Sequence, residues 1–308
     1  MIKKILKWTG IILLVLIAGV TIVTASRQHL KYDAPYPEIH ASNDTAIIAR
    51  GKHFVLSLAH CTECHSTSNS DSLVNLGKEV PLSGGVPFVL PVGTIYSKNI
   101  TSDKETGIGN LTDVEIARVL RFGVHANGEA VYDFMPFHNM SDEDLTAVIS
   151  YLRTLQPVKN KVPDNKLNVM GNAVKAFMVK PVGPSGEVPV AMHPDTTSAY
   201  GKYLVLSIGN CAGCHTKRDI SGAYLAPILS GGAPMSGLTP PNLTNDSTGR
   251  IFNWTEQQFI DRFHKGKLFA KSEMPWNCYK RMNDDELKAI YKFLKTVPAT
   301  KTLDVTSK

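Results

Sequence analysis

The chain has 308 residues, of which 43% are hydrophobic and 19% are charged, a composition typical of folded globular proteins and not of disordered ones. This length exceeds what one hydrophobic core ordinarily serves, so we expect two domains. The formal net charge of +6 includes Lys3, Lys4 and Lys7 in an N-terminal segment without acids. The remaining positive charge is small and scattered, which argues against nucleic acid as a partner.

The N-terminus combines these lysines with a nearly unbroken apolar run from Trp8 to Ala25. The run lies at the short end of what spans a bilayer and exceeds the core of a usual signal peptide. Residues 1–28 are therefore predicted to be a membrane anchor or a signal segment, and we favour an uncleaved transmembrane helix because the sequence before Ser26 is a weak cleavage site. The lysines hold the N-terminus in the cytoplasm, so the rest of the chain is expected on the periplasmic or extracytoplasmic side of the cell membrane.

Four of the five cysteines form two C-x-x-C-H motifs, which read CTECH at residues 61–65 and CAGCH at residues 211–215. In an exported chain disulfides are the first alternative, but they give no reason for a histidine to follow both pairs. Zinc usually takes two such pairs in one compact module, and a dithiol redox site needs a strand and helix framework that the sequence does not indicate. The motifs are best explained by covalent attachment of two haem c groups.

Each motif supplies two thioether bonds to the porphyrin and a histidine as proximal ligand of the iron. The predicted cofactor-binding residues are Cys61, Cys64, His65, Cys211, Cys214 and His215. A methionine followed by proline occurs later in each half, and we favour Met135 and Met274 as the sixth iron ligands, because a thioether ligand suits electron transfer. The alternatives are Met140 and Met282, interpreted as hydrophobic staples, and His138 and His264, which are not equivalent in the two halves.

The motifs belong to a longer internal repeat, in which residues 51–65 align without a gap on residues 201–215. Helix signals recur in both halves: Thr112 with Glu115 and Thr255 with Gln258 as capping boxes, Gly123 and Gly266 as stops, and Ser141 and Asn283 as caps of the closing helices. Strand patterns are scarce. The sequence therefore predicts a mainly α protein with domains at residues 41–158 and 198–299, joined by a linker at residues 159–197 in which Pro and Gly leave room for one short helix, Asn172–Val179.

Each half resembles a class I cytochrome c domain, with CxxCH after a first helix, a later methionine and a closing helix of the type SDEDLTAVISYL. The runs GTIYSKNITSDKETGIGNLTDVEIARVLRFGV and MPFHNMSDEDLTAVISYLRTLQPV are similar to the cytochrome c subunit of membrane-bound alcohol and gluconate dehydrogenases, and the similarity covers roughly residues 45–298. It implies two tandem class I cytochrome c domains. It also implies a first helix, beginning near Thr45, that crosses the closing helix, with Gly51 and Gly201 close to aromatics such as Tyr151 and Phe293. Pro91, Asn99 and Asn242 are expected to line the haem crevices.

The resemblance implies an electron carrier and not an enzyme: a membrane-tethered dihaem cytochrome c that transfers electrons between a dehydrogenase or quinone and a respiratory acceptor, such as an oxidase or another cytochrome. Family members typically carry three haem domains, whereas this sequence shows two. The alternative is a dihaem cytochrome c peroxidase, but that enzyme needs unequal haems, and both halves here keep a Met-Pro pair. Cys278 is left over, and we interpret it as a small buried residue beside a haem in preference to a link to another chain.

Overall fold

The computed structural model describes residues 1–135, 137–219 and 222–302. After the N-terminal helix, the first half contains α2 (Thr45–Leu56), α3 (Cys61–His65), α4 (Ser70–Asn75), α5 (Asp113–Phe122) and α6 (Asp142–Thr154). The second half contains α8 (Ser198–Tyr203), a π-helical turn η1 (Leu204–Ile208), α9 (Cys211–His215), α10 (Glu256–His264), α11 (Trp276–Tyr279) and α12 (Asp284–Thr296). The expected mainly helical fold is confirmed.

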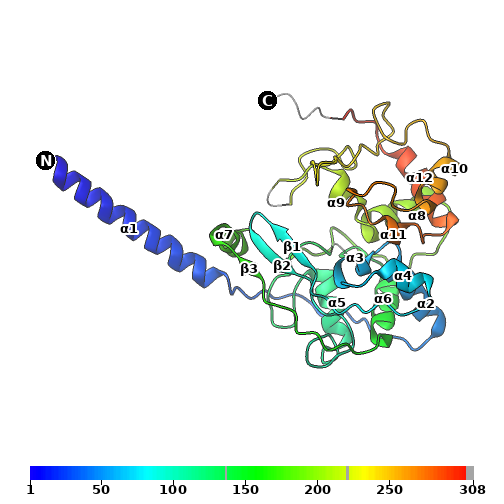
Figure 1. The fold of residues 1–308 in the computed structure, drawn as a ribbon, viewed down its shortest axis with the longest axis horizontal. Helices are drawn as coiled ribbons and strands as arrows, with labels where there is room; N and C mark the ends of the chain where they lie inside the picture. Colours follow the sequence, from blue (N-terminus) through cyan, green and yellow to red (C-terminus); the bar gives the residue numbers. More distant parts are fainter. Residues whose placement is uncertain (136, 220–221, 303–308) are drawn as a thin grey trace.

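The N-terminal helix α1 (Ile2–Arg27) projects away from the rest of the molecule, and none of its side chains is buried (Figure 1). Its apolar window has a mean hydropathy of 2.3, so in length and composition it qualifies as a membrane span. A signal sequence meets the same criteria. The structure thus agrees with an anchor or signal segment at residues 1–28.

The helix ends follow the capping signals of the sequence. The side chain of Thr112 accepts a hydrogen bond from the N–H of Glu115, and the side chain of Thr255 accepts one from the N–H of Gln258. In both pairs the side chain of the second residue accepts a hydrogen bond from the N–H of the first, which completes a capping box. Ser141 caps α6 and Asn283 caps α12, as predicted. Gly123 ends α5 with a φ of 62°, a left-handed conformation that favours glycine. Gly266 has the same conformation but lies two residues beyond the end of α10.

The first helix of each half packs across the closing helix, α2 on α6 and α8 on α12, and a glycine lies at each crossing. A Cβ atom on Gly51 would lie 1.8 Å from the carbonyl oxygen of Ala147, and one on Gly201 would lie 1.9 Å from that of Ala289. The nearest atoms therefore belong to the main chain of the closing helices and not to Tyr151 and Phe293, as had been expected. The glycines bring main chain against main chain, which no side chain would permit.

A small antiparallel sheet that the sequence did not indicate joins the linker to the first half. Its strands β1 (Pro87–Leu90) and β2 (Gly93–Tyr96) form a hairpin, and β3 (Lys166–Leu167) pairs with β2. The linker helix α7 (Val169–Phe177) follows directly, starting three residues before the predicted position. Further on, the N–H of Asp142 donates to the carbonyl of Pro189 at 3.1 Å, so the linker lies along the first half.

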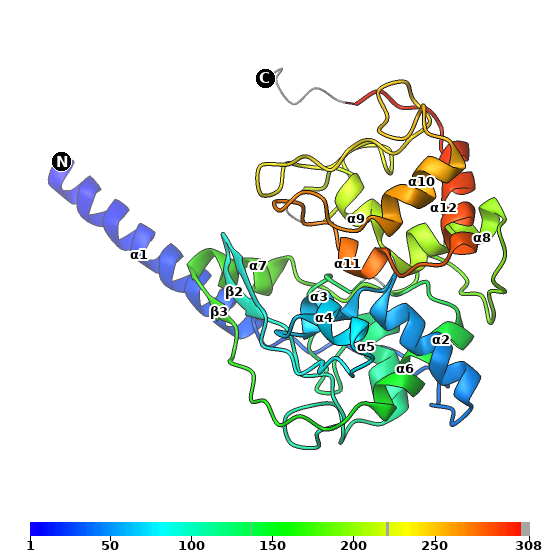
Figure 2. The same cartoon turned by 45° about the vertical axis from the view of Figure 1, so that its right-hand side comes forward.

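The two halves lie side by side and bind each other through equivalent positions of the repeat (Figure 2). His53 of the first half lies 2.8 Å from Glu286, the third residue of α12. The hydroxyl of Tyr203, which corresponds to His53 in the repeat, donates to Asp144, the third residue of α6, at 2.6 Å. The interface therefore has approximate two-fold symmetry. In each half, the first helix binds the first turn of the closing helix of the other half.

Candidate haem sites

The two C-x-x-C-H motifs form the short helices α3 and α9, and the same backbone conformation leads into each. The residues before them, His60 and Asn210, have φ values of 41° and 46°, a left-handed turn that ends the preceding helix and starts the motif. The cysteines of both motifs carry free thiols and no disulfide joins them within the described chain. The disulfide interpretation therefore finds no support in the structure.

The histidine of each motif is oriented by one hydrogen bond to a main-chain carbonyl. The Nδ1 atom of His65 lies 2.7 Å from the carbonyl oxygen of Lys98, and that of His215 lies 2.8 Å from the carbonyl oxygen of Pro241. Both side chains are buried, and burial lowers the pKa of both imidazoles, which keeps the rings neutral. A neutral ring that donates from Nδ1 carries its lone pair on Nε2. Among the described residues, the Nε2 atoms of His65 and His215 have no hydrogen-bond partner. Such a nitrogen is suited to bind iron.

The sequence reasoning missed Lys98 and Pro241, although they occupy equivalent positions immediately before Asn99 and Asn242. In the first half the side-chain oxygen of Asn99 accepts from the N–H of Thr101 at 3.0 Å, and its amide donates to the carbonyl of Val158 at 2.8 Å. The second half repeats this arrangement, with Asn242 bonded to Thr244 and Thr300. The asparagines thus tie the carbonyl-bearing loop to the chain that follows each closing helix. Pro91, by contrast, lies in the turn of the β1–β2 hairpin.

The thiols of the motifs are not poised for dithiol exchange. Burial raises the pKa of Cys61 and of Cys211 to about 12, and that of Cys64 to about 11. Thiol exchange uses the thiolate, which such a pKa disfavours. In the described part of the chain no group of three or more His, Cys, Asp or Glu side chains is placed to hold a metal ion.

The four candidate methionines separate into two kinds. Met135 and Met274 are partly buried against the core, and each accepts a hydrogen bond on its own carbonyl from the N–H two residues on, at 2.9 Å and 2.7 Å. Met140 and Met282 are 1% and 2% exposed and lie inside the core just before α6 and α12, as hydrophobic staples would. Pro136, the partner of Met135 in the predicted Met-Pro pair, lies outside the described residues.

Neither alternative histidine has a free ring nitrogen. His138 contacts the carbonyl of Arg121 through Nδ1 and the carboxylate of Asp133 through Nε2, both at 3.2 Å. His264 contacts the carbonyl of Lys280 at 3.1 Å and Asp284 at 2.8 Å. Both histidines therefore have structural roles, and the assignment of Met135 and Met274 as sixth ligands stays a prediction.

The short helix α11 contacts the first motif and the residues that lead into both motifs. The sulfur of Cys278 lies 3.1 Å from the hydroxyl of Thr62, between the two cysteines of the first motif. The hydroxyl of Tyr279 donates to the carbonyl of Gly209, two residues before the second motif, at 3.1 Å, and its ring meets His60 edge-on with centroids 5.7 Å apart. Cys278 is completely buried, which agrees with its interpretation as a small buried residue, and its sulfur is not exposed to another chain.

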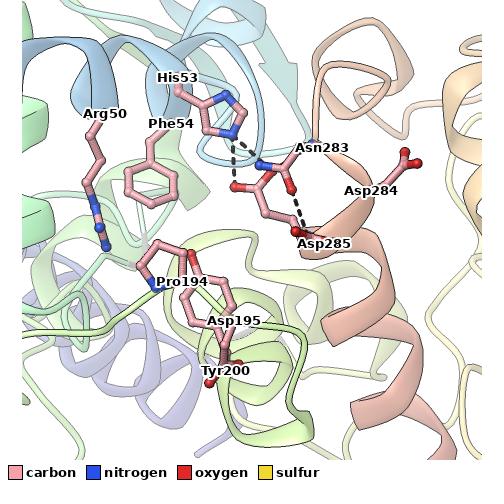
Figure 3. Close-up of a pocket in the computed structure, with 10 residues that line it drawn as sticks. Arg50, His53, Phe54, Pro194, Asp195, Tyr200, Asn283, Asp284 and Asp285 are labelled. Atoms are coloured by element: carbon pink, nitrogen blue, oxygen red, sulfur yellow. Dashed lines mark hydrogen bonds and ion pairs between the residues drawn. The ribbon is translucent and has the colours of Figure 1, made fainter. Parts of the chain in front are cut away.

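A groove of about 420 Å³ opens between the halves, where α2 meets the start of α12 (Figure 3). Its lining includes Arg50, His53 and Tyr200, and it contains none of the predicted haem ligands. Its buried carboxylates are paired, Glu286 with His53 and the neighbouring Asp144 with Arg50. The groove therefore belongs to the interface between the halves and is lined by residues other than the predicted haem ligands.

Residues 198–298, which include the second C-x-x-C-H motif, match the cytochrome c family model, so the chain contains a cytochrome c domain. The chain is 31% identical over 293 residues to the gluconate 2-dehydrogenase cytochrome c subunit of Pantoea cypripedii, covering 84% of this chain and 61% of that protein. It is 31% identical over 290 residues to the cytochrome c subunit of the quinone alcohol dehydrogenase of Gluconobacter oxydans, covering 84% and 57%. A diheme cytochrome c-type protein of Cereibacter sphaeroides is 27% identical over 304 residues, covering 93% of this chain and 96% of that protein. The chain therefore spans less than two thirds of the length of the two dehydrogenase subunits.

Proposed function

We propose that this cytochrome is a dihaem electron carrier that is tethered to the membrane by α1 and exchanges electrons with a dehydrogenase or quinone on one side and a respiratory acceptor on the other. One observation carries the proposal: the geometry around His65 is repeated around His215, each ring fixed by a main-chain carbonyl and each beside two unpaired cysteines. The repetition supports a second haem domain at residues 41–158, in addition to the domain that matches the family model.

The residues of the chain have distinct tasks in this proposal. Cys61, Cys64, Cys211 and Cys214 would attach the porphyrins, and His65 and His215 would bind the irons. Haem c supplies a reversible one-electron Fe(II)/Fe(III) couple when bound. Met135 and Met274 would be the further iron ligands, which would favour the reduced state and deny exogenous ligands a free position.

The position of α11 supports electron transfer between the two sites. The spacing from Met135 to Met140 is five residues, whereas that from Met274 to Met282 is eight, so the second half contains three additional residues at this point. Cys278 and Tyr279 lie in this longer segment, where Cys278 contacts the first motif and Tyr279 contacts Gly209 just before the second. These contacts support a path for electrons through the protein between the two motifs.

The partners are inferred from the relatives. The names of two of them assign them to gluconate and alcohol dehydrogenases as cytochrome c subunits. We infer a dehydrogenase as electron donor and a quinone, an oxidase or another cytochrome as acceptor, with the haem domains on the extracytoplasmic side. The relatives do not favour the peroxidase alternative, and this chain is an electron carrier and not an enzyme.

The test is the haem content and ligation of the full chain extracted from membranes. Wild-type protein should contain two covalent haems per chain, show the charge-transfer band of Met-ligated ferric iron, and fail to bind carbon monoxide when reduced. The paired changes Cys61→Ala with Cys64→Ala, and Cys211→Ala with Cys214→Ala, should each remove one haem and leave the other spectrum intact. One haem per chain in the wild type, or rapid carbon monoxide binding, would contradict the proposal.

A further inference from the structure

The linker helix α7 exposes an apolar face to solvent. Val169 is 88% exposed, Met170 is 51% exposed and Phe177 is 44% exposed. At about 100° per residue, these side chains and that of Ala173 fall on one side of the helix. The apolar stripe of a surface helix ordinarily faces the protein core. Here the largest apolar side chains face outward.

This helix is joined rigidly to the β1–β2 hairpin. The side chain of Asn168 caps α7 and donates to the carbonyl of Pro91 in the hairpin turn at 2.8 Å. Gly171, in the first turn of α7, packs so closely that a Cβ atom would lie 2.0 Å from the carbonyl oxygen of Val92. Val89, on the outer side of β1, is 80% exposed. The exposed apolar surface therefore continues from the helix onto the hairpin.

The same unit lies beside the C-terminal end of the candidate membrane span. Helices α1 and α7 are in contact, and both views of the fold place α7 and the hairpin at the last turns of α1 (Figures 1 and 2). Arg27, the final residue of α1, donates from Nε to the carbonyl of Ala176 at 3.1 Å, and its guanidinium lies 5.3 Å from the ring centre of Phe177. If α1 spans a bilayer, α7 lies at the level where the span ends.

The charge of this region fits an anionic surface. Residues 161–182 contain Lys161, Lys166, Lys175 and Lys180 but a single acid, Asp164. Arg27 adds positive charge on the adjoining chain, where the exposed Lys31 pairs with Glu129 at 3.7 Å. Basic side chains around an apolar helix face are the pattern of helices that lie in the headgroup layer of membranes.

We propose that α7 and the β1–β2 turn form a second membrane contact, seated among the headgroups of an anionic phospholipid bilayer beside α1. The proposal rests on the proposed role of α1 as an anchor. Val169, Met170 and Phe177 enter the boundary with the acyl chains, together with Val89 of the hairpin. The surrounding lysines reach the lipid phosphates, as long basic side chains do at membrane interfaces.

The contact would fix how the first haem site is presented to the membrane. Phe88, beside Val89 on β1, stacks on Phe134 with ring centres 6.2 Å apart, and Phe134 precedes the proposed ligand Met135. A hairpin held in the headgroup layer therefore keeps the Met135 loop near the bilayer surface. A lipid-soluble electron carrier such as a quinone would approach from that side.

The experiment uses full-length holoprotein in vesicles of phosphatidylcholine and phosphatidylglycerol, with spin labels on single introduced cysteines. The labelled variants are Val169→Cys and Phe177→Cys on α7, Leu16→Cys in the middle of α1, and Val190→Cys as a matched control. Val190 is an apolar residue, 70% exposed, in the part of the linker that contacts the start of α6. The native Cys278 is fully buried and is not expected to react with the spin label. Wild-type protein treated with the same label gives the background signal and checks this expectation.

The readout is the ratio of label relaxation by oxygen, which partitions into lipid, to relaxation by a water-soluble nickel complex. We expect the ratio at positions 169 and 177 to exceed that at position 190 several-fold, and Phe177→Asp to return position 169 to the aqueous value. A lipid-exposed label at position 16 with aqueous values at 169 and 177 overturns the second contact while leaving the anchor in place. Aqueous values at all four positions overturn both the contact and the anchor.

Discussion

His65 and His215 are each held by a carbonyl oxygen of the main chain, so the residue that supplies it can differ between the halves, lysine at position 98 and proline at position 241. A hydrogen bond to the ring nitrogen that faces away from a metal fixes both the tautomer and the ring plane. At the scale of single residues, the two sites therefore hold their histidines in the same way, although the residues that supply the carbonyls differ.

Replacing Met135 with histidine should lower the midpoint potential of one haem and leave that of the other unchanged. A thioether ligand favours ferrous iron, whereas a second imidazole stabilises ferric iron, and axial ligands as a class move haem potentials over roughly 0.8 V. The equivalent change Met274→His should lower the other potential. Spectroelectrochemical titration of the intact protein separates the two couples.

The matched controls are Met140→Leu and Met282→Leu. Both methionines are buried in the core, and a change that conserves volume should cost less than about 1.5 kcal/mol of unfolding free energy without moving either potential. If instead Met140→Leu shifts a potential and Met135→His does not, the two methionines have been assigned the wrong way round.

At the scale of secondary-structure elements, each half depends on a helix crossing that only glycine permits. The missing side chains of Gly51 and Gly201 let α2 and α8 touch the main chains of α6 and α12. The closing helices also carry the residues that bind the other half. A displaced crossing should therefore disturb both the core and the interface.

Gly51→Ala should destabilise the protein by at least about 1–3 kcal/mol, the usual cost of overpacking a core, because the new methyl group meets a carbonyl that cannot move independently of α6. Gly201→Ala should have a similar effect on the second half. Chemical denaturation followed by circular dichroism measures the loss. Gly186→Ala serves as control, since no atom lies within 4 Å of its added Cβ and the change should stay within about 0.5 kcal/mol.

At the scale of the whole molecule, two of the contacts that join the halves occupy equivalent positions of the repeat but differ in chemistry. His53 meets Glu286 in one, and Tyr203 meets Asp144 in the other. The hydrogen bond to Glu286 raises the pKa of His53 above its ordinary value of 6.5, against the opposing effects of burial and of the charge on Arg50. Burial and the charge of Asp144 raise the pKa of Tyr203, which therefore stays neutral at physiological pH.

The interface should therefore weaken as the pH rises above neutrality. A raised pKa in the folded state means that the stabilisation from protonated His53 is complete below about pH 6.5 and is lost as the pH rises through the raised value. Because the imidazole is one third exposed, the contribution should not exceed about 1 kcal/mol. The measurement is the unfolding free energy at mildly acidic and mildly alkaline pH.

Two variants isolate this contribution. His53→Gln keeps a hydrogen-bond donor near Glu286 but cannot titrate, so it should remove part of the pH dependence. Tyr203→Phe should lower stability at every pH and leave the pH dependence as in the wild type. An identical pH dependence in His53→Gln and in the wild type would show that His53 is not the titrating group.

Sequence-based reasoning succeeded where the structure depends on short spacings along the chain. The C-x-x-C-H motifs, the capping boxes at Thr112 and Thr255 and the caps at Ser141 and Asn283 all lie within one or two helical turns of the residues they serve. Local geometry is set there by hydrogen bonds between neighbours, so residue types at fixed offsets are sufficient to predict it. The N-terminal helix belongs to the same group, because a long uninterrupted apolar run is sufficient to predict it.

The β1–β2 hairpin was missed because its short strands carry no such local signal. Its strands have four residues each, a proline at the turn and an outward-facing Val89, and such short segments carry no clear alternation of apolar and polar residues. The exposed face of α7 was missed as well, because the sequence of an amphipathic helix does not say whether its apolar side meets protein or solvent. The contact of α7 with α1 and the hairpin decides that.

The sequence by itself determined that the protein contains two C-x-x-C-H motifs in a mainly helical repeat behind an apolar N-terminal helix, since each of these features is a pattern over neighbouring residues. Only the tertiary structure decided which carbonyls hold His65 and His215, that Gly51 and Gly201 meet main chain, and that Cys278 lies against the opposite half. These contacts join residues far apart in the chain, and their partners are main-chain groups or residues of ordinary type. Nothing in local spacing or hydrophobic period marks such a partner before the chain has folded.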